Sequence, residues 1–316
     1  MSFFPRALTA PLPAPGLSIA WEETNCPLCG GGEWSGLVEA PDTSSGGKGL
    51  WFAVVQCHEC GLCFTNPRPD QSSIGQFYPH EAYPPYQPGP RKGPGWLRNW
   101  WSRQRRRDGQ ALAWHGQGRL LDFGCGGGAF LQRMGQVGWQ VTGLDISATT
   151  VCRIRADLGL RVLVGSLPHP DLHPESFDVI TMWHSLEHVH QPREVLREAH
   201  RLLTPEGKLL IAVPNIDSLP YRWFGPDWYG LDLPRHLTHF TPMTLGLMLE
   251  RTGFRIRAME MIRHPNWLCA SARRALARRR LPYWNRWLTS KPAARAVSWF
   301  SSLTRQADCI LATAGK

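Results

Sequence analysis

Four cysteines in the N-terminal part of the sequence are spaced as metal ligands. Cys26 and Cys29 form one Cys-x-x-Cys pair, Cys57 and Cys60 form another, and a glycine follows each pair. Each pair lets two thiolates reach one ion, and two pairs supply the four ligands of a closed tetrahedral zinc site. We therefore expect a structural zinc ion rather than four unpaired reduced thiols.

A glycine-rich turn farther along the chain has the setting of a nucleotide site. Residues 119–123 are typical of a buried strand, Gly124-Cys-Gly-Gly-Gly128 breaks it, and residues 129–134 have helical spacing. A second strand over 140–145 ends in Asp145. This order of elements is typical of a βαβ unit that binds a nucleotide cofactor.

The acid at position 122 helps to decide between two possible cofactors. Gly124, Gly126 and Ala129 also satisfy a dinucleotide fingerprint, which would indicate NAD. A carboxylate at Asp122 would repel a pyrophosphate, but it suits the ammonium group of S-adenosylmethionine. The sequence therefore favours S-adenosylmethionine over NAD.

Four histidines are candidates for a general base. His184 and His188 follow a predicted strand, with Glu187 between them, and His236 and His239 lie three apart in a later loop. A neutral imidazole can take the proton of an acceptor hydroxyl near neutral pH. In the alternative, these histidines only hydrogen-bond their loops. A second metal is disfavoured, because positions 184, 187 and 188 do not share one helical face.

Several of these segments resemble class I S-adenosylmethionine-dependent methyltransferases. Leu121-Asp-Phe-Gly-Cys-Gly-Gly-Gly128 is similar to their first motif, and Gly143-Leu-Asp-Ile-Ser147 to the end of their second strand. Residues 177–189 and 202–211 resemble the fourth and fifth strands with their flanks. The paired cysteine turns and residues 65–69 and 234–241 resemble a bacterial subgroup with an N-terminal zinc-ribbon-like segment. Members of that subgroup are often associated with modification of glycans or other small metabolites.

The resemblance implies a set of cofactor-binding positions. Asp122 and the backbone of the glycine turn would hold the methionine part, Asp145 the ribose hydroxyls, and Ile146 one face of the adenine. At the position of Ser166, such enzymes often have an acid or amide that hydrogen-bonds the adenine amino group. A serine there weakens this expected contact. The implied positions are Asp122, Gly124, Cys125, Gly126, Gly128, Asp145, Ile146, Ser166 and His184.

These residues require an α/β fold to bring them together. Alternating strands and helices predict a doubly wound, seven-stranded and mostly parallel sheet with a small N-terminal zinc ribbon. The expected parts are a flexible leader over 1–20, the zinc-ribbon-like module over 21–66, a Pro/Tyr-rich connector with a basic Trp/Arg helix over 67–110, and the methyltransferase domain over 111–316. That domain carries a basic amphipathic insertion at about 264–304.

The net charge of +10 is concentrated in two segments. Residues 91–107 carry +7 and residues 264–316 carry +9, so the rest of the chain carries −6. Tryptophans alternate with the arginines in both segments, which suits an interfacial helix on anionic lipid, an RNA-binding surface, or a lid over the substrate. The sequence has no apolar run of the ~18 residues that a membrane span needs, and no secretory signal. We expect a cytoplasmic protein, with peripheral contact to the inner membrane face as a further hypothesis.

The function that fits best is transfer of a methyl group from S-adenosylmethionine to an O, N or C nucleophile of a small molecule or glycan precursor. One alternative is a tRNA or rRNA methyltransferase that holds RNA with the ribbon and basic helices, although the acidic body offers no continuous cationic track. Another is a non-catalytic interaction protein with a vestigial cofactor fold. An NAD-dependent oxidoreductase ranks last.

Overall fold

The computed structural model describes residues 19–42, 49–78, 117–280 and 282–316 of the 316-residue chain. The basic Trp/Arg helix expected near residues 94–107 lies outside the described residues, as does nearly all of the expected leader.

A seven-stranded sheet forms the centre of the molecule and confirms the predicted α/β architecture. Its strands lie in the order β12-β13-β10-β9-β6-β7-β8, and all run parallel except β13, which is antiparallel to both of its neighbours. The strands are β6 (Arg119–Phe123), β7 (Gln140–Asp145), β8 (Val162–Val164), β9 (Phe177–Trp183), β10 (Leu203–Pro214), β12 (Arg255–Ile262) and β13 (Cys309–Gly315). Ligands of such sheets bind beyond the carboxyl ends of the parallel strands.

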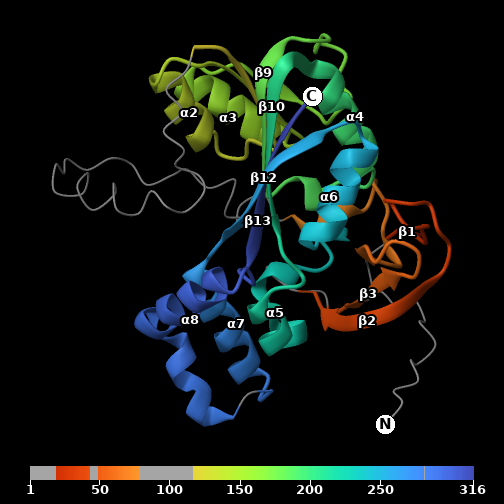
Figure 1. Cartoon of the computed structure of the whole chain (residues 1–316), viewed down its shortest axis with the longest axis vertical. Coiled ribbons are helices and arrows are strands. Elements are labelled where there is room, and N and C mark those ends of the chain that lie inside the picture. The colour runs from red at the N-terminus through yellow and green to blue at the C-terminus, as the bar shows by residue number, and fades with distance from the viewer. Residues whose placement is uncertain (1–18, 43–48, 79–116, 281) are drawn as a thin grey trace.

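Helices cover both faces of this sheet. In Figure 1, α2 and α3 lie on one side of the sheet, and α4 and α6 lie on the other. The helices are α2 (Ala129–Gln136), α3 (Ala148–Leu158), α4 (Pro192–Leu202), α5 (Leu219–Phe224) and α6 (Pro242–Arg251). Ser147 caps α3, and Thr241 and Thr244 form a capping box at α6, so local sequence fixes where both helices begin.

The cysteine-rich module shares a sheet with the methyltransferase-like domain. Its strands are β1 (Trp21–Glu22), β2 (Trp34–Pro41), β3 (Trp51–Cys57), β4 (Cys63–Thr65) and β5 (Arg68–Pro69). A four-stranded sheet in the order β11-β4-β3-β2 includes β11 (Thr238–His239), which belongs to the C-terminal domain. Thr238 pairs with Phe64 and His239 with Cys63, so the module is built into the main fold.

Part of the segment expected as a connector is packed. Residues 67–78 contain β5, which pairs with β1, and the 3-10 helix η1 (Ile74–Phe77). The Phe77 ring is fully buried and meets Phe52 edge-on, with ring centroids 5.8 Å apart. Burial of this ring explains why residues 67–78 belong to the folded module despite their prolines.

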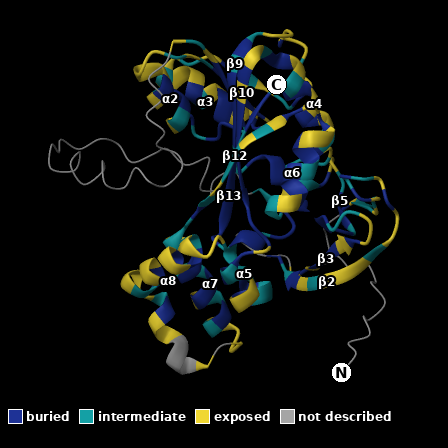
Figure 2. Cartoon of the chain, viewed as in Figure 1, coloured by how far each residue is buried: buried dark blue, intermediate teal, exposed yellow. Residues whose placement is uncertain are grey.

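Two helices fill the insertion between β12 and β13. They are α7 (Pro265–Ala277) and α8 (Lys291–Leu303), with the 3-10 helix η6 (Tyr283–Thr289) between them. Leu268, Ala272 and Ala294 are buried in a shared cluster. The opposite side of the insertion is exposed, as the exposed turns of α8 in Figure 2 show. None of the helices in the described part of the chain combines the length and apolar character that a membrane crossing requires.

Candidate functional site

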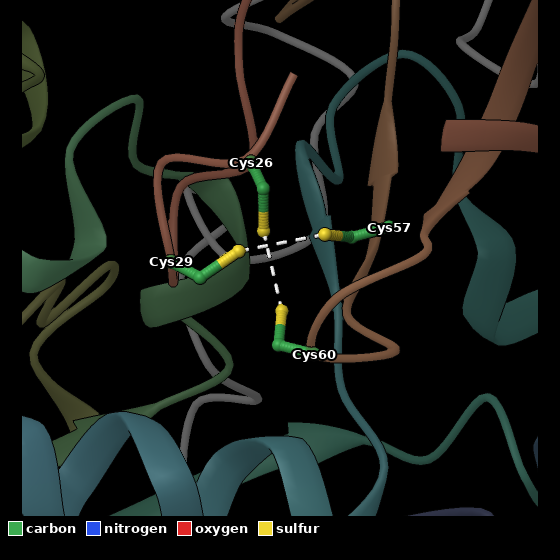
Figure 3. Close-up of side chains that lie close together, drawn as sticks. All are labelled: Cys26, Cys29, Cys57 and Cys60. Atoms are coloured by element: carbon green, nitrogen blue, oxygen red, sulfur yellow. Dashed lines mark hydrogen bonds between the residues drawn. The ribbon is translucent and has the colours of Figure 1, made fainter. Parts of the chain in front are cut away.

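The four predicted zinc ligands converge on one point. The sulfurs of Cys26 and Cys60 lie 3.4 Å apart, and so do those of Cys29 and Cys57. All four sulfurs lie within 4.8 Å of one another, and Figure 3 shows the side chains pointing inward from two turns.

This sulfur cluster fits a tetrahedral Zn²⁺ ion. Zn–S bonds of about 2.3 Å separate tetrahedral sulfurs by about 3.8 Å, close to the spacing found here. Burial raises the pKa of Cys60 to about 11, so without a cation this thiol keeps its proton at neutral pH. A dication would hold all four sulfurs as thiolates, which is the usual chemistry of a zinc site with four cysteine ligands.

The glycine turn lies at the carboxyl end of β6, beside the end of β7. Asp145 accepts hydrogen bonds from the backbone N–H of Gly126 and of Ser147, both at 2.9 Å. Gly124 has a φ of 72°, and a Cβ there would lie 2.6 Å from the Cβ of Ser185. Only glycine fits that approach, so the loop after β9 packs directly on the glycine turn.

Asp122 lies buried under this turn. Its Oδ1 accepts a 2.6 Å hydrogen bond from the Thr181 hydroxyl on the neighbouring strand β9. Burial raises the pKa of Asp122 to about 7, outweighing the Thr181 hydrogen bond. A cationic ligand group beside this carboxyl would favour its ionised form.

The remaining predicted cofactor positions surround the same edge. Ile146 is 69% exposed, so its side chain is accessible to a ligand that would cover it. Gly128 has a φ of 76° and begins α2. Cys125 is buried and its thiol pKa is raised by burial, so it is not primed as a nucleophile. Ser166 is half-buried just after β8.

His184 follows β9 directly and adopts a left-handed backbone, with a φ of 51°. Its backbone N–H donates to the Ala212 carbonyl at 2.9 Å, which helps to hold this strained conformation. The ring lies between Glu187 Oε1, 3.3 Å from Nδ1, and Cys309 Sγ, 3.9 Å from Nε2. Burial opposes the charged imidazole, but the Cys309 sulfur and the Glu187 carboxylate together raise the pKa of His184 to about 10.

Three residues surround His184 that are not among the predicted site residues: His264, Trp267 and Cys309. His264 stacks on Trp267 with ring centroids 4.5 Å apart, and Trp267 lies 5.3 Å from the His184 ring. His184, His264 and Cys309 bring their ligand atoms within 4.8 Å of one another. The sequence spacing could not predict this group, because it depends on the direction of a strand. β13 runs antiparallel to its neighbours, so its first residue, Cys309, lies where the parallel strands end.

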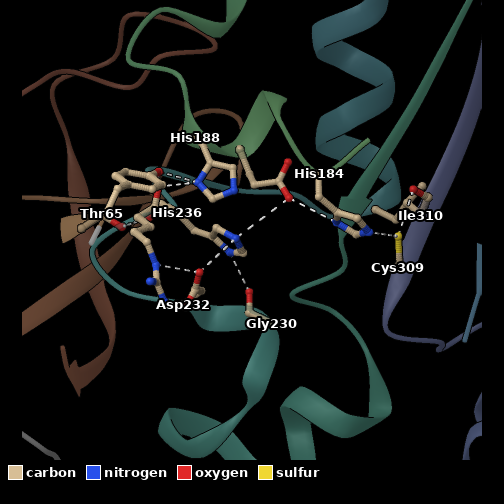
Figure 4. A network of polar contacts seen from close by, with 11 residues as sticks. Thr65, His184, His188, Gly230, Asp232, His236, Cys309 and Ile310 are labelled. Carbon is tan, nitrogen blue, oxygen red and sulfur yellow. Dashed lines mark hydrogen bonds and ion pairs between the residues drawn. The ribbon is translucent and has the colours of Figure 1, made fainter. Parts of the chain in front are cut away.

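His188 and His236 come together from separate loops. Their ring centroids are 4.6 Å apart and the rings meet edge to face, at 75°. Figure 4 shows the two side chains next to each other, with His184 apart beside Cys309. His188 Nδ1 lies 3.0 Å from the Arg235 carbonyl and 2.8 Å from the Tyr78 hydroxyl. Burial lowers the pKa of His188 to about 4, so this ring is neutral at physiological pH.

Glu187 belongs to both histidine groups. It lies in the short 3-10 helix η3 (Leu186–His188), and its side chain is almost completely buried. Burial would raise the pKa of Glu187, but the hydrogen bond and the charge of His184 lower it overall. The group is therefore a buried carboxylate at neutral pH, next to three imidazole rings, those of His184, His188 and His236.

His239 has a different environment from its sequence neighbour His236. Its Nε2 lies 3.1 Å from the Thr65 hydroxyl, in the strand pair that joins the cysteine module to the domain. Burial lowers the pKa of His239 to about 3. The four candidate histidines thus divide by environment, with His188 and His236 paired, His184 beside Cys309, and His239 against Thr65.

A family model described as "Methyltransferase domain" matches residues 95–259, more than half of the chain. The protein therefore belongs to this methyltransferase family, in agreement with the predicted resemblance to class I S-adenosylmethionine-dependent enzymes. The cysteine-rich segment lies N-terminal to the matched region.

Among similar curated proteins are enzymes called ubiquinone biosynthesis O-methyltransferase. The one from Aeromonas salmonicida is 30% identical over 46% of this chain and 66% of its own length. The one from Photobacterium profundum is 34% identical over 44% of this chain and 64% of its own length. The matched region thus spans about two thirds of the length of these relatives.

Solved structures show the same fold at low identity. The [4+2]-cyclase SpnF matches with a TM-score of 0.51 and 20% identity, over 79% of this chain and 97% of its own chain. This likeness concerns the fold alone, because a common fold hosts different chemistries.

Proposed function

We propose that this protein transfers the methyl group of S-adenosylmethionine to a hydroxyl oxygen of a small molecule or glycan precursor. The observation that carries the proposal is a largely buried imidazole–carboxylate cluster of Glu187, His188 and His236. Glu187 and His188 belong to the loop after β9, which packs on the glycine turn through Ser185. Relatives named as O-methyltransferases support an oxygen acceptor.

The chain's own residues suit the cofactor. The Asp145 carboxylate, held by two backbone N–H groups, would bind the ribose hydroxyls, and Asp122 would face the ammonium group. The exposed Ile146 would pack on the adenine. S-adenosylmethionine, when bound, supplies a methyl group whose carbon–sulfur bond breaks as the bond to the acceptor oxygen forms.

The imidazole–carboxylate cluster would activate the acceptor. A hydroxyl is a weak nucleophile until its proton is removed or its oxygen is stabilised as an anion. His188 is neutral and half-buried, and the neighbouring Glu187 is ionised. His184 would stay protonated, because its pKa is about 10, so we assign it to orienting Glu187.

Methyl transfer is tested with labelled S-adenosylmethionine and a panel of phenols, nucleotide sugars, lipid-linked sugars and transfer RNA. We expect label in a hydroxyl-bearing small molecule or sugar. Failure of the protein to bind S-adenosylmethionine in calorimetry would refute the proposal and favour the non-catalytic alternative. Label in RNA alone would favour the RNA methyltransferase alternative.

We further propose that the four-cysteine cluster holds a structural Zn²⁺ ion. The sulfur spacing and the inward orientation of all four side chains support this. Because β4 of the module pairs with β11, the ion would also stabilise the loop that carries His236 and His239.

The basic insertion supports our proposal that this enzyme, which we place in the cytoplasm, makes peripheral contact with anionic lipid. Trp299 and Phe300 are each 56% exposed and Leu303 is 62% exposed on α8, among the basic residues of the insertion. Exposed aromatic side chains beside cations suit the interface of a negatively charged bilayer. Trp267, on α7, lies instead against His184, which supports the lid hypothesis for that helix.

A further inference from the structure

We propose that Glu187, His188 and His236 form a second metal site, which holds a divalent cation against the oxygen of the methyl acceptor. The ligand atoms of these three residues lie within 4.8 Å of one another. The inference rests on the proposed methyl transfer and names the class of acceptor: a phenol, enol or other hydroxyl whose oxygen can bind a metal ion.

The hydrogen bonds of both imidazoles leave the same ring nitrogen bare. His236 Nδ1 lies 2.9 Å from the Gly230 carbonyl, and His188 Nδ1 lies 3.0 Å from the Arg235 carbonyl. A carbonyl only accepts, so we assign the hydrogen of each ring to Nδ1. The Tyr78 hydroxyl oxygen, 2.8 Å from His188 Nδ1, then accepts from the same N–H, and its own hydrogen points toward the Arg235 carbonyl at 3.5 Å. Each Nε2 then carries a lone pair, and neither makes a hydrogen bond within the described part of the chain. Metal-ligating histidines have this arrangement, with the second nitrogen donating to a carbonyl.

The carboxylate of Glu187 has an oxygen without a partner. Oε1 meets His184 Nδ1 at 3.3 Å, whereas Oε2 is buried and has no hydrogen-bond partner among the residues that the structure describes. A buried unpaired carboxylate oxygen is costly, since it has lost its water without gaining another contact. A cation would satisfy it.

A closed network of hydrogen bonds is the competing explanation, and the distances disfavour it. His236 Nε2 lies 4.0 Å from Glu187 Oε1 and 3.8 Å from Asp232 Oδ2, too far for hydrogen bonds. The carboxylates of Glu187 and Asp232 instead place negative charge near His236 Nε2, which carries no hydrogen in this assignment. Asp232 is itself held by Arg235, so it would act through charge rather than as a ligand.

Two imidazoles and one carboxylate suit a zinc, iron, manganese or cobalt dication and leave coordination positions open. The ion would bind the acceptor oxygen there and lower the pKa of its hydroxyl. The hydroxyl proton would pass to water, and the oxygen would take the methyl carbon as in the proposed function. The ion keeps its charge throughout, so no oxidant or reductant is needed.

The test uses full-length protein with its cysteine cluster loaded with Zn²⁺. Co²⁺ is then titrated in, and binding is followed by visible absorption and by metal analysis. We expect a second ion to bind, with d–d bands of nitrogen and oxygen ligands and no thiolate charge-transfer band. Glu187→Gln and His236→Gln should each weaken this binding at least tenfold. Circular dichroism and S-adenosylmethionine binding report whether the variants fold.

Two matched controls distinguish neighbouring sites. Cys309→Ser removes the sulfur of the His184, His264 and Cys309 group, and His239→Gln changes a histidine engaged with Thr65; both should retain the second ion. The proposal is overturned if folded wild-type protein takes no second ion, if folded Glu187→Gln binds it as tightly as wild type, or if Cys309→Ser abolishes it. These readouts need no turnover, so absent methyl transfer would count against the proposed function and not against the metal site.

Discussion

Thr65 donates its hydroxyl hydrogen to the main-chain carbonyl of His236, at 2.7 Å and across 171 positions of sequence. Both residues are buried, and the same hydroxyl oxygen lies 3.1 Å from His239 Nε2. A residue of the cysteine-rich module thus fixes the backbone of a candidate catalytic loop. The module is therefore structurally coupled to the site and is not an independent attachment.

Replacing Thr65 with valine should therefore affect both stability and catalysis. The change preserves shape but leaves the His236 carbonyl and the His239 ring without their partner, at a cost of about 1–3 kcal/mol in free energy of unfolding. We expect lower kcat for methyl transfer with nearly unchanged affinity for S-adenosylmethionine. Urea unfolding and steady-state kinetics measure the two effects. Thr204→Val, at the start of β10 in the seven-stranded sheet, is the control. An unchanged kcat in Thr65→Val would contradict the coupling.

Removing a ligand of the cysteine cluster should release zinc. Cys57→Ser deletes one of four converging sulfurs, so bound zinc should fall below one ion per four-sulfur site and the unfolding temperature should fall with it. Loss of a structural ion costs several kcal/mol as a rough expectation. Elemental analysis and thermal unfolding give the readouts. Cys152→Ser, at an exposed cysteine of α3, should change neither. Equal zinc content in Cys57→Ser and wild type would count against the four-cysteine site.

Asp145→Asn should weaken cofactor binding. The variant keeps the side-chain shape but loses the charge that would accept hydrogen bonds from the ribose hydroxyls. We expect affinity for S-adenosylmethionine to fall about tenfold or more, equivalent to ~1.4 kcal/mol. Calorimetry measures this directly. Asp157→Asn, on the exposed side of α3, should bind like wild type, and wild-type affinity in Asp145→Asn would remove this residue from the ribose site.

The raised pKa of Asp122 predicts a pH dependence of stability. Its folded pKa of about 7 lies above the ordinary value of 3.8, so the unfolded chain gives up this proton at lower pH than the folded chain. Stability should therefore fall as pH rises from about 4 to about 7 and level off above that, at roughly 1.4 kcal/mol per pH unit at most. Asp122→Asn, which mimics the protonated form, should flatten this slope.

The same carboxyl links pH to cofactor binding. An ammonium group beside Asp122 favours the ionised form, so binding of S-adenosylmethionine near pH 6 should release a proton. Calorimetry in buffers of different ionisation enthalpy counts it. Asp308, whose pKa burial raises to about 6, remains in Asp122→Asn and leaves a weaker slope in stability. Identical stability profiles for wild type and variant would show that folding does not raise the pKa of Asp122.

The exposed aromatic side chains of α8 should contribute to lipid binding. Trp299→Ser combined with Phe300→Ser should reduce flotation with anionic vesicles about tenfold or more, because two large apolar side chains no longer enter the interface. Vesicles of neutral lipid and the variant Val137→Ser, at an exposed valine next to α2, serve as controls. If the double variant floats like wild type, these aromatics have no part in membrane contact.

The sequence determined the elements whose signals are local. The glycine turn between 123 and 129 and the two Cys-x-x-Cys turns are contiguous motifs, and the structure has a strand, a turn and a helix at the first and a four-sulfur cluster at the second. The predicted strand over 140–145 is observed as β7, with the same bounds. Hydrophobic periodicity and spacing are enough here, because the contacts involved join near neighbours in the chain.

Tertiary structure alone decided which side chains meet at the candidate site. Spacing grouped His184 with His188 and His236 with His239, whereas the fold brings His188 to His236 and sets His184 beside Cys309. The first pairing depends on how two loops pack, and the second on the reversed direction of β13. Neither pairing produces a periodic pattern in the sequence, because loop packing and strand order depend on burial across the whole domain. For the same reason Thr65 became part of the site only when β4 paired with β11.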